Sequence, residues 1–333
     1  MQSAALGNRL AATMVDQTNT FTSPAVGTFT AVPSVAQKSR VTVEVKTETP
    51  FLPKAAFLLI SVASLAGTYL TGKLHGVEGP ALVWRWLQFW GVALPTGMLA
   101  WRLFYLRRQE SGVDVGCVAD LHVDLLARVR KVSRYLAPLL VAGAGASLVL
   151  PYLATWTAVA LTASSLAIAV LITQAHRSRA AAVAAFVFGV GALVLWGLGD
   201  SSGLGFLAAV RTIHLLAFAA WLGGALFNLG AAVPAGRKNA NLDAVVAGAR
   251  QLERFRWVVR TSLPTIIVTG VWMALRYGGV TSAFWLSGIG LLVPFKLLLI
   301  GALVVIFITC PLYRACSPVR GVCNLDDLGP DAG

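Results

Sequence analysis

The chain has 333 residues, of which 57% are hydrophobic and only 12% are charged, and its mean hydropathy is +0.73. Soluble domains carry about 25% charged residues, so this composition excludes an ordinary soluble protein and indicates an integral membrane protein. The formal net charge of +13 does not indicate nucleic-acid binding, because the basic residues cluster at the ends of apolar segments, as the positive-inside rule requires.

Residues 1–50 differ from the rest of the chain. They are rich in Ser, Thr, Ala and Val, contain only three acidic residues, and have no apolar core long enough for a signal peptide. Such a segment is typical of an organellar transit peptide or of a disordered cytoplasmic tail. The scarcity of arginine, at Arg9 and Arg40 only, favours the tail.

Beyond residue 50 the apolar segments predict an all-α, polytopic transmembrane helix bundle of about eight spans. A span needs about 20 apolar residues. The predicted spans are residues 55–72, 81–106, 135–151, 156–174, 180–198, 206–232, 257–277 and 288–310. Five of them would form a transmembrane bundle over residues 51–200, three a second domain over 201–315, and a C-terminal tail would follow at 316–333.

Lys and Arg are distributed unequally between the loops on the two sides of the predicted bundle. The loops at 199–205 and 278–287 hold none, and the loop at 73–80 holds only Lys73. The basic segments are 107–134, 175–179, 233–256 and both tails. Both termini are therefore predicted on the cytoplasmic side. The membrane would be a bacterial inner membrane, or that of a plastid or another organelle if residues 1–50 are a transit peptide.

The ionisable residues of the predicted spans fall into two groups, those near the end of a span and those deep inside it. Four arginines lie near a span end, where long side chains can reach the interface: Arg85, Arg102, Arg260 and Arg276. Three groups lie deeper: Arg211, His214 and Lys296. Ionisable groups at membrane depth are costly and are therefore candidates for function.

The deep groups predict a ligand site in the outer half of the bundle. Arg211, His214 and Trp221 share one helical face by their spacing, and Met273 lies at a similar depth to His214. The predicted ligand or transport site is formed by Arg211, His214, Trp221 and Lys296, with His214 and Met273 as candidate metal ligands.

No Asp or Glu falls inside a predicted span, and only Asp200 lies at the rim. A buried cation without an acid must lose its charge, bind backbone carbonyls, or meet an anionic ligand. Two structural alternatives stay open: Lys296 could snorkel to the interface or cap backbone carbonyls at a helix kink beside Pro294, and a neutral His214 could bond to a neighbouring backbone.

The run Arg211…His214…Trp221-Leu-Gly223-Gly224 resembles the signature of the copper resistance protein D family. Two further stretches agree with it: Arg254-Phe255…Thr269-Gly270, and Gly290…Lys296 followed by Arg314. The resemblance covers about residues 205–315. It implies copper transport across the membrane, with copper as the substrate, His214 and its neighbours as the site, and a copper-binding partner protein on the outer side. The remaining contacts of the chain would be with membrane lipids.

A second interpretation is a haem- or porphyrin-binding redox protein, since the helix pattern is also reminiscent of a membrane family of protoporphyrinogen oxidases. His214 would then be an axial ligand with Met273 opposite, and Arg211 or Lys296 would pair with propionates. A packing subunit without a ligand is the third interpretation. The sequence has no paired carboxylates, phosphate-binding glycine loop or metalloprotease motif, which favours a transporter over an enzyme.

The C-terminal tail carries Cys310, Cys316 and Cys323. These cysteines could receive a soft metal on the cytoplasmic side, or they could be unpaired or palmitoylated juxtamembrane thiols.

Overall fold

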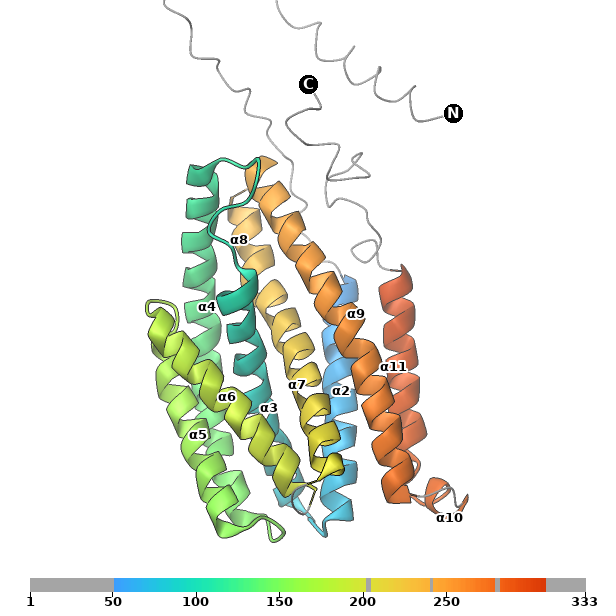
Figure 1. Cartoon of the computed structure of the whole chain (residues 1–333). Coiled ribbons are helices and arrows are strands. Elements are labelled where there is room, and N and C mark those ends of the chain that lie inside the picture. Colours follow the sequence, from blue (N-terminus) through green and yellow to red (C-terminus); the bar gives the residue numbers. More distant parts are fainter. Residues whose placement is uncertain (1–50, 202–204, 240–241, 279–281, 310–333) are drawn as a thin grey trace, which may run out of the picture. The chain divides into compact units, whose positions relative to one another are not determined.

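A computed structural model describes residues 51–201, 205–239, 242–278 and 282–309 (Figure 1). In this part of the chain every regular element is helical. The helices are α2 (Phe51–Leu74), α3 (Pro80–Ala100), α4 (Val115–Ala144), α5 (Thr155–Gln174), α6 (Arg179–Gly199), α7 (Phe206–Phe227), α8 (Val233–Lys238), α9 (Leu242–Gly278), α10 (Ser282–Trp285) and α11 (Leu292–Thr309). A π-helical turn, Trp101–Tyr105, continues α3, a second one, Asn228–Ala232, continues α7, and a 3-10 turn, Gly145–Val149, continues α4.

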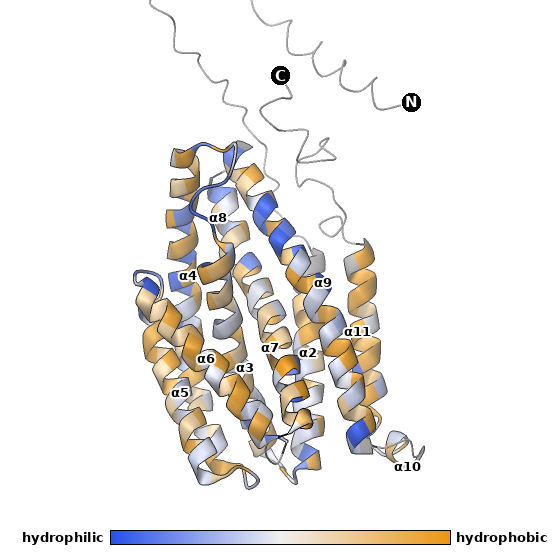
Figure 2. Cartoon of the chain, viewed as in Figure 1, coloured by the Kyte–Doolittle hydropathy of each residue, from blue (hydrophilic) through white to orange (hydrophobic). Residues whose placement is uncertain are grey.

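Six helical segments are long and apolar enough to cross a membrane, which makes the chain an integral, multi-pass membrane protein. Within the described residues they are Lys54–Leu74, Val115–Val149, Thr155–Gln174, Arg179–Gly199, Phe206–Lys238 and Asp243–Tyr277. The apolar helix Leu292–Ile306 is shorter. Figure 2 shows hydrophobic residues along most of the helices and hydrophilic ones at the upper end of α9 and in the loop before α4.

Six of the eight predicted spans correspond to these segments, and the other two, 81–106 with α3 and 288–310 with the shorter α11, do not meet the same criterion. Two of the helices also begin well before the predicted span. α4 begins at Val115 rather than near residue 135, and α9 begins at Leu242 rather than near residue 257. The first turns of each helix carry charged residues, so an apolar span is not predicted there. A helix can nevertheless continue beyond the hydrocarbon, because water solvates its polar face. The Asp114 side chain caps α4 by accepting a hydrogen bond from the Cys117 amide, which stabilises that early start.

α3 occupies the middle of the bundle. It packs against α2, α4, α6 and α7, so most of it contacts protein rather than lipid, while Val83 and Trp84 near its start are exposed. Polar side chains are tolerated there because they find partners on neighbouring helices. Gln88, for example, donates hydrogen bonds to the Ala144 carbonyl at 3.2 Å and to the Ser147 hydroxyl at 3.1 Å. This central position allows α3 to carry buried polar side chains such as Arg85 and Gln88.

The helices on the two sides of residue 200 pack together. α3 lies along α7, and α2 lies along both α3 and α11. The predicted domains 51–200 and 201–315 therefore share packing surfaces. The predicted tails 1–50 and 316–333, together with Arg314, Cys310, Cys316 and Cys323, lie outside the described residues. Cys117 is a free, half-buried cysteine.

Candidate functional site

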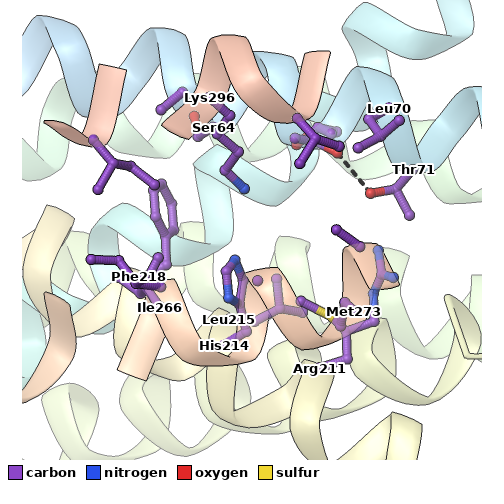
Figure 3. Close-up of a pocket in the computed structure, with 18 of the residues that line it drawn as sticks. Ser64, Leu70, Thr71, Arg211, His214, Leu215, Phe218, Ile266, Met273 and Lys296 are labelled. Carbon is purple, nitrogen blue, oxygen red and sulfur yellow. Dashed lines mark hydrogen bonds between the residues drawn. The ribbon is translucent and has the colours of Figure 1, made fainter. Parts of the chain in front are cut away.

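A cavity of about 160 Å³ lies among α2, α7, α9 and α11. All the residues predicted to form the ligand and metal site line it: Arg211, His214, Trp221, Met273 and Lys296. Figure 3 shows His214 and Lys296 pointing into this cavity from opposite sides, with Arg211 and Met273 next to each other. The rest of the lining is mostly apolar, with Phe218 and Ile266 among the contributors.

Asp200, the C-cap residue that follows α6, is the acidic partner of Arg211 in the cavity. Its carboxylate Oδ2 lies 2.5 Å from Arg211 Nη2 and 2.6 Å from Arg85 Nη2, and only 3% of the residue is exposed. The Tyr152 hydroxyl donates a hydrogen bond to Oδ1 at 2.8 Å. Both carboxylate oxygens are thus bonded, which is the condition under which a buried charge is tolerated.

The expectation that Arg85 reaches the membrane interface is wrong. Its side chain is 2% exposed and donates to Asp200, to the Tyr152 hydroxyl at 2.8 Å and to the Thr68 carbonyl at 2.5 Å. Its guanidinium also lies 5.3 Å from the ring centre of Trp196. Depth along a helix does not distinguish a lipid-facing arginine from one that faces the bundle. The neighbouring Trp84 is 49% exposed, whereas Arg85 lies on the buried face of α3.

Two further side chains bind the backbone of Asp200. His75 Nε2 lies 2.9 Å from the Asp200 carbonyl oxygen, and its ring stacks on Tyr152 with centres 4.4 Å apart. The Tyr277 hydroxyl of α9 lies 3.3 Å from the same carbonyl. We call Arg85, Tyr152, Asp200, Arg211, His75 and Tyr277 the Asp200 network. It ties α2, α3, α6, α7 and α9 together at one end of the cavity.

The charges of the network favour an ionised Asp200. Burial alone would raise the pKa of its carboxyl, but the charges of Arg211 and Arg85 and the Tyr152 hydrogen bond outweigh burial and hold the pKa below its usual range. The carboxylate therefore keeps its negative charge and compensates one of the two arginines.

Because His75 is partly buried, we expect the stability of the protein to depend on pH. Burial lowers the pKa of His75 below the ordinary value of 6.5, although the Asp200 charge opposes that shift. Because the unfolded chain then binds the proton more readily than the folded protein, the free energy of unfolding falls as the pH decreases below about 6.5. We expect His75→Gln to flatten this decrease between about pH 7 and about pH 5, measured by thermal unfolding of the purified protein in detergent. Equal slopes for the two proteins would refute the assignment to His75.

His214 is held in one orientation by α9. The Thr269 hydroxyl donates to the Thr265 carbonyl, so it accepts from His214 Nδ1, which lies 2.8 Å away. Nδ1 therefore carries the ring proton, and Nε2 keeps a lone pair, since the hydrogen bond made by one ring nitrogen determines the tautomer. Gly270 lies beside the ring, where a Cβ would be in van der Waals contact with His214 Cε1 at 3.4 Å. His214 is thus hydrogen-bonded to the Thr269 hydroxyl and also contacts the backbone of Ile266 on the same helix, α9, as the alternative of a backbone partner expects.

Lys296 differs from the two arginines because no partner for its ammonium group is found among the described residues. Its Nζ lies against α2, where a Cβ on Gly67 would be 2.7 Å away. The alternative that Lys296 caps backbone carbonyls beside Pro294 is wrong for the part of the chain that the structure describes. Counting Asp200 against Arg85, Arg211 and Lys296 leaves the cavity and its end with an excess of positive charge.

The donor set around the cavity is poor in metal ligands. Over the described residues, no group of three or more His, Cys, Asp or Glu side chains is placed to hold a metal ion. A soft copper ion would have only His214 Nε2 and the Met273 thioether in this cavity, beside the cations Arg211 and Lys296.

The haem interpretation stays a prediction. Its proposed axial ligands His214 and Met273 and its proposed propionate partners Arg211 and Lys296 all line this cavity of about 160 Å³.

The sequence does not predict Arg85, His75, Tyr152 or Tyr277 as parts of the site, and it includes Thr269 only as part of the family motif. A hydroxyl residue in an apolar segment carries no distinctive signal, since most such groups bond to their own helix. Asp200 was noted at the rim, and one signal could have assigned its role. It directly follows an apolar segment in a loop without Lys or Arg, so its charge had to be met by arginines of the helices.

Comparison of the chain with protein-family models, with curated proteins and with solved structures finds no match. The resemblance to the copper resistance protein D family stays a prediction that depends on the motifs quoted above.

Proposed function

We propose that this multi-pass membrane protein binds an anionic ligand in the cavity among α2, α7, α9 and α11, as a transporter-type protein rather than an enzyme. One observation carries the proposal. The Lys296 ammonium lies against this largely apolar cavity without an acidic partner among the described residues, while the nearby acid, Asp200, is already shared by Arg85 and Arg211.

An uncompensated cation in an apolar site is costly, and an anion that enters the site removes part of that cost. Hydrogen bonds to charged groups contribute about 1.5–3 kcal/mol each, so an anionic oxygen on Lys296 would supply a substantial part of the binding energy. Lys acts as a point charge with three rotatable donors, which accommodates either a carboxylate or a phosphate.

Lys296 requires a hydrogen-bond acceptor on the ligand, whereas His214 requires a donor. Its Nε2 is a hydrogen-bond acceptor because Nδ1 donates to Thr269. The best ligand for the pair therefore presents an anionic oxygen to Lys296 and an O–H or N–H donor to His214, as a hydroxycarboxylate or a monohydrogen phosphate does. Trp221, which is 4% exposed, lines the same cavity and would contribute apolar contact.

The first test is a change at Lys296. We expect Lys296→Met to weaken the binding of lactate or inorganic phosphate by at least about 10-fold, in line with the loss of one charged hydrogen bond, and Lys296→Arg to retain more of the affinity. Isothermal titration of the purified protein in detergent measures both. Arg102→Met is the matched control, because it removes a half-buried cation whose contact, the Ser178 carbonyl, is remote from the cavity. Equal losses in the Met variants, or no anion binding by the wild-type protein, would contradict the proposal.

Copper transport is the second candidate, favoured by the fact that His214 and Met273 line the same cavity. Imidazole and thioether are suitable ligands for Cu(I). Titration of the same preparation with Cu(I), followed by metal analysis, separates the candidates. Copper that is bound by the wild-type protein and lost on Met273→Leu and His214→Ala, without any anion binding, would replace the first proposal with this one.

A further inference from the structure

The cavity has an opening between α9 and α11. α11 packs along α2, and α9 packs along α7, whereas the described parts of α9 and α11 have no extended packing surface with each other. Residues of both helices line the cavity and are also exposed: Val271 of α9 is 37% exposed and Leu297 of α11 is 43% exposed. Side chains that belong to the cavity thus reach the outer surface at this position.

The surface around this opening is apolar. Val268 and Leu275 of α9 and Leu298 of α11 are exposed large hydrophobic residues, and Lys296 is the one charged residue in the sequence of α11. In an integral membrane protein such a surface faces lipid. A fully hydrated anion would not enter by that route, since charge is expensive in hydrocarbon, but a lipid-like molecule would.

Resting on the anion site proposed above, we propose that the ligand is a single-chain amphiphile with an anionic head group, which enters from the bilayer between α9 and α11. The head group binds Lys296 and His214. The first part of the alkyl chain fills the cavity, whose volume of about 160 Å³ is close to that of an engineered apolar cavity that binds benzene. The remaining chain passes Val271 and Leu297 into the surrounding lipid.

Chain length and charge can be tested separately on the wild-type protein. The protein is placed in nanodiscs and labelled with a photoreactive dodecanoic acid, against competing dodecanoate, dodecyl phosphate, dodecanol and butyrate at equal free concentrations in the aqueous phase. Each buried methylene contributes about 0.8 kcal/mol, or about 4-fold in affinity, so we expect dodecanoate to compete at least about 10-fold better than butyrate. Dodecyl phosphate, whose monohydrogen form also offers an O–H to His214 Nε2, should compete at least as well as dodecanoate. Clearly weaker competition by dodecyl phosphate would contradict the contact of the head group with His214. Dodecanol should fail.

A matched pair of variants tests the route. Leu297→Trp narrows the opening, and we expect it to reduce labelling at least about 5-fold. This loss exceeds the effect on affinity of a change of one methylene in apolar contact, which is about 4-fold. Leu298→Trp adds the same bulk to the neighbouring exposed residue, which does not line the cavity, and should leave labelling unchanged.

The possible failures are distinguishable. If butyrate competes as well as dodecanoate, or if the two tryptophan variants behave alike, the lateral amphiphile is wrong while the anion site stands. If dodecanol competes as well as dodecanoate, the charge is not recognised and the proposed function fails with it.

Discussion

Replacement of Asp200 with asparagine is expected to lower the free energy of unfolding by about 3–5 kcal/mol, the cost of leaving a buried charge without its partner. Asp200 is the shared acid of Arg85 and Arg211, which are both buried, with exposures of 2% and 6%. Asparagine preserves the size of the side chain but supplies neither the charge nor two equivalent acceptors. Both guanidinium groups would then stay buried with excess positive charge.

Equilibrium unfolding of the protein in mixed micelles measures this effect. Glu78→Gln is the control, because it removes a carboxylate that is 81% exposed and paired with Lys73 at the surface, where such pairs contribute at most about 1 kcal/mol. A triple variant, Arg85→Met with Asp200→Leu and Arg211→Met, should recover much of the stability, since replacing a whole buried ionic group by apolar residues is often neutral. Equal losses for Asp200→Asn and Glu78→Gln would show that the Asp200 network is not a structural element.

The second large effect is expected at the crossing of α3 and α7. Gly97 and Gly223 lie against each other there, and a Cβ on either glycine would overlap with backbone atoms of the opposite helix. Backbone cannot rotate away as a side chain can, so the helices must separate. We expect Gly223→Ala to lower the free energy of unfolding by about 3 kcal/mol, the upper end of the usual cost of overpacking.

Gly191→Ala in α6 is the matched control for Gly223→Ala. A Cβ at Gly191 meets nothing within 4 Å, so alanine should be neutral or stabilise the helix by up to about 1 kcal/mol. The pair Gly97→Ala and Gly223→Ala should be strongly non-additive, because the first substitution already separates the helices at the shared contact. Additive losses in the same unfolding assay would refute a direct backbone contact at this crossing.

The helical segments could be predicted because apolar runs of span length leave few other structures possible in a bilayer. The clustering of the site residues on α7 could also be predicted, since Arg211, His214 and Trp221 are spaced to share one face. The starts of α4 and α9 could not, because helix formation extends beyond the apolar run into residues whose polar faces are solvated.

The sequence by itself determined that this is a polytopic helical membrane protein and that Arg211, His214 and Lys296 lie too deep to be ordinary surface charges. Both statements follow from hydropathy and from distance along a helix, which are properties of the chain alone. Only the tertiary structure decided which of these charges is compensated. It brings Arg85 of α3 and Arg211 of α7 to the carboxylate of Asp200, and it leaves Lys296 of α11 facing His214 across the cavity. The reason is that ion pairing depends on which helix faces meet, and the pattern within one helix does not contain that information.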